Sequence, residues 1–544
     1  MRRGFLAMSS AFRQPVFLIS VFLIACLLIA GAAFPAAFEI GANAALAWVT
    51  RTFGWFYLLS VFGFVAVLVY LGFSKYGETR LGPPDSTPEF SYYSWVAMLL
   101  AAGFGIGLVF YGVAEPMSHF ARPAEPSVTR ETAEAARRAI QYSFFNWGLS
   151  QWAAFSIVGL IIGFYQFRRG QPGLVSVVMR PLTGETDAKP GKIGGALDVF
   201  ATVATVMGVA TSLGLGVLQI NGGMAFLFGL PEGFTWQAII LVFVAVAYMI
   251  SASTGLDKGI RILSSINLGL AMALMVFVLV FGPTIAILRT LVQGLGDYLQ
   301  YFFEMSLNAD AYDNPEWVGS WTIFYWAWVI SWSPFVGTFV ARISRGRTIR
   351  EYVIGVLVMP PLIAAVWIGI FGGAALTLEL QQEPGLALAV QQNITTALFK
   401  LLELLPMPMV TSVFAMLLIL VFLVTSADSA SYIVAQLTDQ GSINPPLAKR
   451  LVWGGLIAAI CLTLIATGGL QGLQAGVIIA ALPFTVILYL MVWALFRELA
   501  ADRATALAAL YEAHDQTPVG ATIEEARRLD EEGERPADDN EVAD

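Results

Sequence analysis

The chain has 544 residues, of which 57% are hydrophobic and 12% are charged, and its mean hydropathy is +0.72. Ordinary soluble domains carry about twice that share of charged residues, so the composition excludes a soluble globular protein and indicates an all-α polytopic membrane protein. The formal net charge is −8. Residues 497–544 carry fourteen carboxylates against five arginines, which is typical of a solvated tail rather than of an acidic substrate site.

Apolar runs long enough to cross a bilayer recur about twelve times, by the criterion of roughly 20 residues per helix. No cleavable signal is expected, because the first run is too long and lacks a small-residue cleavage site. The expected spans are 16–36, 55–73, 93–114, 140–165, 195–219, 234–252, 262–286, 319–340, 353–378, 408–434, 450–468 and 474–496.

The basic residues predict the orientation of these spans. With the amino terminus inside, the cytoplasmic segments hold eighteen lysines and arginines and the external segments hold seven, leaving the tail aside. This asymmetry follows the positive-inside rule. We therefore expect a multi-pass protein of the cell membrane with both termini in the cytoplasm.

Residues 319–335 hold four tryptophans within a single span, Trp321, Trp326, Trp328 and Trp332. An indole face attracts a cation by about 0.5–2 kcal/mol per contact. The alternative is an interfacial aromatic belt, but a belt gathers at one depth, whereas eleven residues of helix rise about 16 Å. The pattern favours a lining role for at least two indoles, and Ser333-Pro334 is expected to open the backbone because proline has no amide donor.

Three alternating glycines, Gly103, Gly105 and Gly107, interrupt the third span. Close packing of helices through small residues is the alternative, but that motif has a spacing of four. Alternation favours a broken helix whose exposed N-terminus could bind an anion. Interrupted spans 3 and 8 lie five spans apart, which indicates an inverted-repeat secondary transporter built from helices 3–7 and 8–12.

Residues 424–431 combine hydroxyl groups with one carboxylate, Asp428, in the tenth span. Hydroxyl and carbonyl oxygens suit a hard cation such as Na⁺, although such hydroxyls often bond back to their own helix. An acidic residue inside the bilayer is a functional candidate. His119 and His514 are expected outside the spans, and Asp198 and Asp428 are almost the only titratable groups inside, so we expect no enzyme.

Two connections between spans are expected to form helices on the outer side. Residues 291–305 alternate apolar and polar side chains at helical spacing, as an interfacial helix does, and residues 386–405 carry too many polar residues for a span. Either could be a lid or an oligomer contact.

These patterns divide the chain into six segments. They are a cytoplasmic N-terminus (1–14), two leading spans (15–92), a first inverted repeat (93–286), an interface helix and loop (287–318), a second repeat (319–497) and an acidic cytoplasmic tail (498–544).

Several motifs resemble those of the betaine/choline/carnitine transporters over residues 15–497. They are the glycine triplet, TSLGLG at 211–216, GLDKGIR at 255–261, GSWTIFYWAW at 319–328 and TSADS at 425–429. The resemblance implies the five-helix inverted-repeat fold, a homotrimer packed through the helix at 291–305, and substrates that are trimethylammonium compounds or related osmolytes.

The resemblance also implies an aromatic box and a carboxylate-holding end for the substrate. The box falls on Trp147, Trp152, Phe155, Trp328 and Val329, and the carboxylate end on Trp332, Ala102, Phe104 and Gly105. Two box positions depart from the glycine betaine type, because Phe155 stands for Tyr and Val329 for Trp. Choline-type members tend to carry Asp at Gly107, so glycine there fits a zwitterion.

Sodium positions follow from the same resemblance. The main site falls on Ala101, Phe104, Phe422, Thr425 and Ser426, and a second, half-kept site on Thr205 and Phe335. Val209 replaces a hydroxyl ligand of the second site. Sodium-independent members place an arginine inside span 7, and this chain has none between Arg261 and Arg289.

The expected function is sodium-coupled import of a zwitterionic quaternary-ammonium osmolyte, with glycine betaine first. Dimethylsulfoniopropionate, carnitine, ectoine and choline are the alternative solutes, and an exchanger or transceptor is the alternative mechanism. We expect no cofactor other than Na⁺ as coupling ion, and no nucleic-acid partner.

Overall fold

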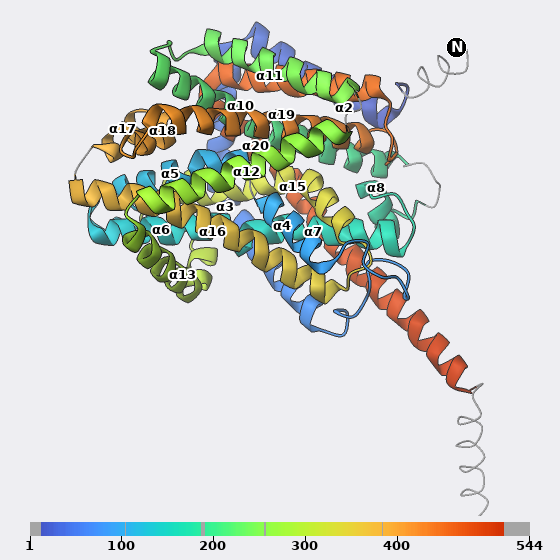
Figure 1. Ribbon diagram of the computed structural model, residues 1–544. Helices are drawn as coiled ribbons and strands as arrows, with labels where there is room; N and C mark the ends of the chain where they lie inside the picture. Colours follow the sequence, from blue (N-terminus) through green and yellow to red (C-terminus); the bar gives the residue numbers. More distant parts are fainter. Residues whose placement is uncertain (1–11, 104, 186–190, 255–256, 383–384, 516–544) are drawn as a thin grey trace, which may run out of the picture. The chain divides into compact units, whose positions relative to one another are not determined.

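The computed structural model describes residues 12–103, 105–185, 191–254, 257–382 and 385–515 (Figure 1). In these ranges the regular structure is helical, apart from one isolated bridge between Arg80 and Thr348. The chain forms two compact units, residues 1–491 and 492–544. The described part of the second unit is the end of the last helix, which reaches Asp515.

Nine helices in the described ranges are long and apolar enough to cross a bilayer, and two bent helix pairs pass the same test. The expectation of an all-α membrane protein is confirmed, whereas the count of twelve spans and the inverted repeat stay predictions. Helices unbroken by a loop are α2 (Pro15–Ala33), α3 (Pro35–Phe73), α10 (Lys192–Phe228), α11 (Phe234–Thr254), α16 (Ile349–Gln382), α19 (Pro408–Leu437) and α20 (Leu447–Asp515). Within α20 the backbone kinks at Gly469 (φ 55°, ψ −128°), where the eleventh and twelfth spans were expected to meet.

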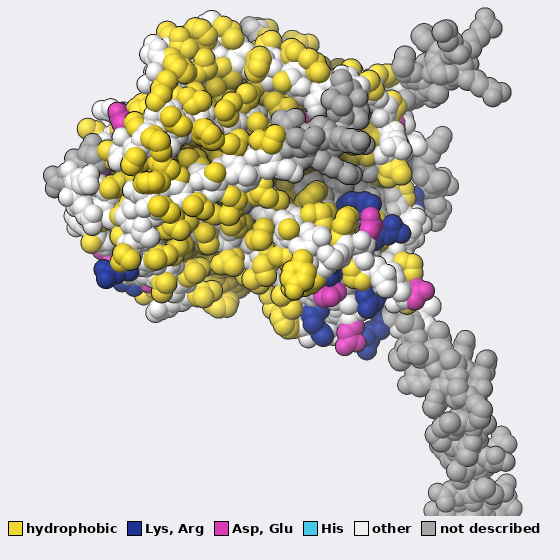
Figure 2. Space-filling view, viewed as in Figure 1, with side chains coloured by type: hydrophobic (Ala, Val, Ile, Leu, Met, Phe, Trp, Pro, Cys, Tyr) yellow, Lys and Arg dark blue, Asp and Glu magenta, His cyan; other side chains and the backbone are white. Residues whose placement is uncertain are grey.

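The outer surface of the helices matches a lipid environment. Figure 2 shows a largely hydrophobic face, on which the charged side chains are confined to a few groups near its edges. Large apolar side chains such as Phe22 of α2, Trp55 of α3 and Phe243 of α11 are more than half exposed. Exposed apolar area of this extent indicates a membrane-facing surface.

Helix α3 differs from the expected second span because it begins at residue 35 instead of 55. The added segment was expected to be a loop. It is rich in alanine and contains neither proline after Pro35 nor a cluster of turn residues, and alanine is the strongest helix former.

Two spans are broken in the middle. Helices α4 (Tyr92–Gly103) and α5 (Ile106–Ala121) meet at an angle of 56°, at the alternating glycines. Helices α6 (Ala133–Trp147) and α7 (Leu149–Gly163) meet at Gly148, whose ψ of −145° ends the helical path. The sequence analysis expected the first break and missed the second.

The expected opening at Ser333-Pro334 is wrong, because α15 (Phe324–Ile343) runs through both residues as a helix. A proline at position 334 leaves the Ile330 carbonyl without its usual amide donor. The Ser333 hydroxyl donates to that same carbonyl at 2.6 Å, so the polar group stays satisfied and the helix does not open.

Before α15 the chain forms α14 (Pro315–Val318) and a π-helical turn, η2 (Gly319–Ile323). Other short elements are a π-helical turn η1 (Phe164–Arg168) after α7, and α8 (Val175–Val178) and α9 (Arg180–Thr183) before α10.

The expected interface helix is α13 (Thr284–Leu307), which turns by 111° from the end of α12 (Asp257–Phe281) at Gly282 and Pro283. It packs on α6 and α16 (Figure 1). The second external helix, in contrast, is divided into α17 (Leu386–Gln392), a 3₁₀ turn η3 (Ile394–Thr396) and α18 (Ala397–Glu403). Asn393 interrupts it. The Asn393 side chain accepts a hydrogen bond from the Thr395 amide at 3.1 Å, and such local bonds compete with the backbone hydrogen bonds of a helix.

The loop after α3 and the loop after α15 are joined to each other. The Leu81 and Arg347 backbones bond at 2.8 Å, and Arg342 binds Glu89 through two hydrogen bonds of 2.5 and 2.7 Å. The hydrogen bond from Arg342 lowers the pKa of the Glu89 carboxyl below its usual value.

We expect Ser333→Ala to lower the thermal unfolding temperature of the purified protein, because the Ile330 carbonyl would lose its donor at a cost of about 1–3 kcal/mol. In a Pro334→Ala background the restored amide can serve that carbonyl, so the same substitution should have little effect. Equal effects of Ser333→Ala in the two backgrounds would show that this hydroxyl does not replace the missing donor.

Candidate functional site

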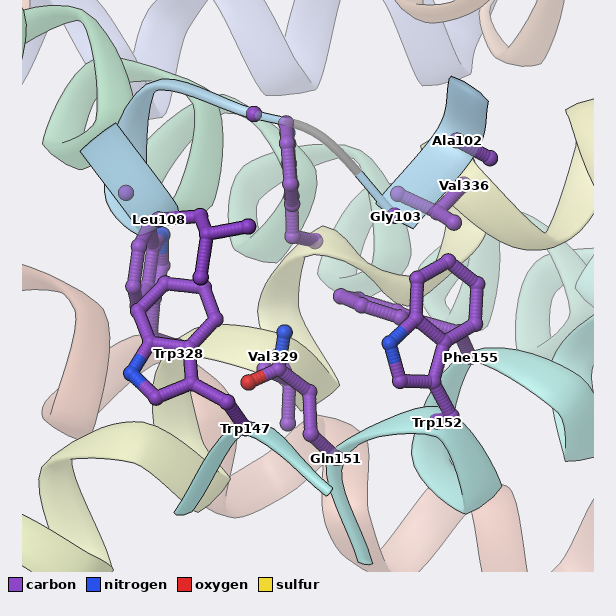
Figure 3. Close-up of a pocket in the computed structure, with 13 residues that line it drawn as sticks. Ala102, Gly103, Leu108, Trp147, Gln151, Trp152, Phe155, Trp328, Val329 and Val336 are labelled. Carbon is purple, nitrogen blue, oxygen red and sulfur yellow. The ribbon is translucent and has the colours of Figure 1, made fainter. Parts of the chain in front are cut away.

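A cavity lies where the two helix breaks face α15 (Figure 3). Glycine and apolar side chains form nearly all of its wall, and none of the lining residues is ionisable. The lining residues are Ala102, Gly103, Gly105, Gly107, Leu108, Trp147, Gln151, Trp152, Phe155, Trp328, Val329, Trp332 and Val336. All the expected substrate residues lie in this set except Phe104, which lies outside the described residues.

The break between α4 and α5 contributes backbone to the cavity. Gly105 is extended (φ −158°, ψ 168°) and precedes the first residue of α5. A Cβ atom on Gly105 would meet no heavy atom within 4 Å, so open space adjoins the chain here. The first amides of a helix have no partner within the helix, so this terminus can donate to an anion.

The break between α6 and α7 sets the positions of two tryptophans. Trp147 is the last residue of α6, and Trp152 follows in the first turns of α7. The amide of Leu149 donates to the Tyr298 hydroxyl of α13 at 2.9 Å, which satisfies one of the free amides at the start of α7. A Cβ on Gly148 would lie 2.5 Å from that hydroxyl oxygen, so only glycine admits this contact.

Two groups of aromatic rings stand on opposite sides of the cavity in Figure 3, Trp147 with Trp328 and Trp152 with Phe155. The first pair meets edge to face at 6.1 Å between ring centroids, and the second at 5.3 Å. The Trp332 ring meets Phe155 edge to face, with the ring centroids 6.0 Å apart, and stacks on Trp328, with the centroids 6.3 Å apart. Four indoles and one phenyl ring therefore surround the cavity.

The remaining tryptophans of residues 319–335 do not line this cavity. Trp326 packs against Phe145, with the ring centroids 5.4 Å apart, and Trp321 packs against His119, 4.5 Å away. Two of the four indoles in that stretch reach the cavity.

Trp147 and Trp328 are held from behind by hydrogen bonds. The Trp328 indole N–H donates to the Ser212 hydroxyl at 3.0 Å. The Trp147 indole N–H donates to the Glu115 carboxylate at 2.8 Å. Because their donors are occupied, these two rings offer the cavity mainly their π surfaces.

Glu115 is a residue that the sequence analysis missed. It is fully buried in α5. Its carboxylate accepts hydrogen bonds from the Trp147 indole and the Asn146 amide, each at 2.8 Å, and from the Tyr325 hydroxyl. One of its oxygens lies 3.2 Å from His119 Nε2. The third span was expected to end at residue 114, and His119 was expected outside it. Both residues are buried within α5, so an acidic residue inside a span was the signal that could have found them.

Two polar atoms in the cavity wall have no hydrogen-bond partner, the indole nitrogen of Trp332 and the side-chain oxygen Oε1 of Gln151. Buried polar atoms are rarely left unpaired in folded proteins. Both side chains therefore keep a hydrogen-bonding capacity that the described protein groups do not use.

Gly107 lies against the edges of two indoles. A Cβ there would be 2.2 Å from Cη2 of Trp328 and 2.9 Å from Cη2 of Trp147. An aspartate at this position would first have to displace Trp328, so the substitution cannot change charge alone.

The expected sodium ligands are placed as follows. The Thr425 hydroxyl of α19 donates to carbonyls of its own helix, those of Val421 at 2.8 Å and Phe422 at 3.3 Å. This is the alternative that the sequence analysis gave for these hydroxyls. A hydroxyl that donates keeps its lone pairs, so this bond does not remove Thr425 as a ligand. Ser426 adjoins it, and the Ala101 carbonyl belongs to the last turn of α4, whose carbonyls lack helical partners.

The second expected sodium site is less open. Thr205 of α10 donates to the Ala201 carbonyl at 2.7 Å, and Phe335 stacks on Trp332 at 5.6 Å. Val209 is buried and supplies no oxygen.

Asp428 is paired rather than free. The Ser251 hydroxyl donates to it at 2.7 Å and Arg450 lies 3.3 Å away. The ion pair joins α19 to α20, the hydrogen bond joins α19 to α11, and together they give Asp428 a structural role.

The chain is similar to known membrane transporters over most of its length. The family model described as BCCT, betaine/carnitine/choline family transporter, matches residues 15–504. An ectoine/hydroxyectoine transporter of Virgibacillus pantothenticus is 50% identical over 482 residues, covering 89% of this chain and 95% of the relative. The glycine betaine transporter OpuD of Bacillus subtilis is 46% identical over 490 residues (90% and 94%), and a glycine betaine transporter of Acinetobacter baylyi is 42% identical over 501 residues (92% and 75%).

We expect Glu115→Gln to destabilise the protein by about 1–3 kcal/mol, because an amide NH₂ would face groups that donate hydrogen bonds. Thermal unfolding followed by tryptophan fluorescence measures the change. The matched control is Glu134→Gln in α6, which removes only a partly exposed ion pair with Arg138 worth about 0–1 kcal/mol. Equal unfolding temperatures for the two variants would contradict a supporting role for Glu115.

Proposed function

Since the chain belongs to the betaine/carnitine/choline transporter family, we propose that it imports a small zwitterionic compatible solute across the cell membrane together with Na⁺. The coarser statement, that the protein is a membrane transporter of betaine-type compatible solutes and not an enzyme, follows from the family itself. The direction of transport, the coupling ion and the solute are the proposal.

The observation that carries the proposal is the composition of the cavity wall. Indole faces stabilise a cationic head, while the unpaired Trp332 N–H and the amides at the start of α5 can hold a carboxylate. Among the described residues that line the cavity, no side chain carries a charge. A ligand whose own charges cancel therefore enters at the lowest cost of desolvation.

Glycine betaine is the first candidate solute, in keeping with the name of two similar proteins. Ectoine is a second candidate for two reasons. Val329 leaves one side of the cavity without a ring, and the ectoine/hydroxyectoine transporter is 50% identical to this chain.

Sodium coupling is supported by the oxygen atoms on α19 and at the end of α4. The hydroxyls of Thr425 and Ser426 and the Ala101 carbonyl supply the kind of hard ligands that Na⁺ prefers. Exchange of one solute for another, without an ion, is the alternative mechanism.

A homotrimer with both termini in the cytoplasm completes the proposal. The outward side of α13 presents Val292, Leu299 and Phe303, each at least 67% exposed. An apolar stripe of this kind suits a contact between protomers within the membrane.

We expect Trp147→Ala and Trp152→Ala each to weaken solute binding about tenfold or more, the upper part of the cation–π range. Competition against radiolabelled glycine betaine and ectoine in proteoliposomes measures the apparent affinity. Trp55→Ala is the control, because that indole is 57% exposed on α3 and should leave affinity unchanged. Unchanged affinity in both cavity variants would mean that these rings serve packing only.

Uptake should be electrogenic and should collapse when K⁺ replaces Na⁺, because each Na⁺ that enters with a neutral zwitterion carries one charge. At about 2.3 kcal/mol per charge per 100 mV, one ion supports roughly fifty-fold accumulation. The double variant Thr425→Ala, Ser426→Ala should raise the Na⁺ requirement far more than it alters solute preference.

With Val209 in the second site, we expect a Na⁺ Hill coefficient nearer one than two. Currents recorded from proteoliposomes of fixed internal composition provide both measurements. Equal uptake in K⁺ without current would identify an exchanger or facilitator instead.

A further inference from the structure

Glu115 places a carboxylate directly behind one ring of the cavity. The side chain is fully buried, and its Oε2 accepts a hydrogen bond from the Trp147 indole at 2.8 Å. Trp147 itself lines the cavity, where it stands with Trp328 on one side (Figure 3). A cation that stacks on an indole lies within about 6 Å of the ring centroid. A single ring therefore separates the carboxylate from the place of a cationic head.

The groups around Glu115 fit an ionised carboxylate. The Trp147 indole N–H and the Asn146 amide NH₂, which lies 2.8 Å from Oε1, can only donate hydrogen bonds. The Tyr325 hydroxyl is a third partner, on Oε2. Hydrogen bonds to an ionised oxygen are roughly twice as strong as neutral ones, so this set of donors stabilises the charged form.

His119 does not cancel this charge. It is the one basic side chain within ion-pair distance of Glu115 in the described part of the chain, with Nε2 3.2 Å from Oε1. Its other ring nitrogen, Nδ1, is buried and has no hydrogen-bond partner among the described groups. An imidazolium would bury an N–H group there without an acceptor, whereas a neutral ring leaves only a lone pair. The neutral ring can still donate from Nε2 to the carboxylate.

We propose that the charge of Glu115 acts through Trp147 on the cationic head of the solute. It selects solutes with a positive head and turns a zwitterion so that the head lies beside Trp147 and the carboxylate lies toward the unpaired Trp332 N–H. This inference rests on the proposed transport function and deepens it. Glu115 is a positioning residue that sets specificity, because it is not among the residues that line the cavity.

The effect reaches across the ring because Glu115 is fully buried and solvent screens a buried charge little. At an effective dielectric constant of about 20, two unit charges about 8 Å apart attract strongly enough to change an affinity about thirtyfold. The hydrogen bond to the carboxylate also polarises the indole. A zwitterion that enters the other way round brings its negative end toward the same carboxylate and is repelled.

The test compares glycine betaine with tert-butylacetate, in which a neutral carbon replaces the quaternary nitrogen. The two ligands share the shape of the head and the carboxylate, and they differ in the charge of the head. Isothermal titration calorimetry on the purified full-length protein in Na⁺ gives both dissociation constants. Their ratio reports how strongly the site responds to the charge of the head.

We expect the wild type to prefer glycine betaine, and Glu115→Gln to lower this preference about tenfold or more. Retained binding of tert-butylacetate shows that the variant is folded. His119→Lys is an independent second variant, because an ammonium group four residues from Glu115 neutralises the carboxylate without removing it. It should lower the preference in the same direction.

Two control variants separate charge from support of the rings. Ser212→Ala removes the hydrogen bond behind Trp328 but no charge. It should weaken both ligands together and leave the ratio within about twofold of the wild type. Glu134→Gln removes a carboxylate that is partly exposed on α6, and it should leave the ratio unchanged as well.

A wild type that does not prefer glycine betaine to tert-butylacetate would overturn the role of the Glu115 charge and leave the proposed transport intact. So would an unchanged ratio in both Glu115→Gln and His119→Lys, or an equal fall of the ratio in Ser212→Ala. Absence of binding and uptake of both glycine betaine and ectoine in the wild type would overturn the proposed function as well.

Discussion

Backbone polar groups that cross a bilayer must find partners inside the protein, because lipid offers none. The structure leaves the helical path at Gly105 and at Gly148, in the middle of two spans. Both breaks face the same cavity, where a ligand or a neighbouring side chain can satisfy the freed amides. The cavity is therefore a consequence of where the chain interrupts its own hydrogen bonding, and α15 closes it as an unbroken helix.

The rings of the cavity are held by buried polar groups that do not themselves line it. Glu115 orients Trp147 and Ser212 orients Trp328. Hydrogen bonds to a carboxylate are stronger than neutral ones, and in a low-dielectric interior they restrict the rings to one orientation. A pocket that is ordered before the solute arrives does not spend binding energy on ordering itself.

The amphipathic helix α13 connects this pocket to the outer surface of the protein. The Tyr298 hydroxyl accepts a hydrogen bond from the first amide of α7. The neighbouring Asp297 accepts two hydrogen bonds of 2.7 Å from Arg137 of α6. One side of α13 thus supports the break at Gly148, while its other side exposes Val292 and Phe303. The same helix therefore supports the break beside Trp147 and presents an apolar face to the outside.

The sequence by itself determined the membrane class, the positions of most spans and the glycine break in the third span, because these follow from hydropathy and backbone propensity. Most of the residues around the cavity were expected from the resemblance of the motifs to a known family, whereas Gly103, Leu108, Gln151 and Val336 were not. Local signals misled at Ser333-Pro334, where a hydroxyl replaces the missing donor. Only the tertiary structure decided how Glu115 accepts hydrogen bonds from Trp147, Asn146 and Tyr325, and that the Gln151 side chain lies in the cavity wall. These contacts join residues from separate helices, and hydrogen bonding between distant segments leaves no periodic trace in a single sequence.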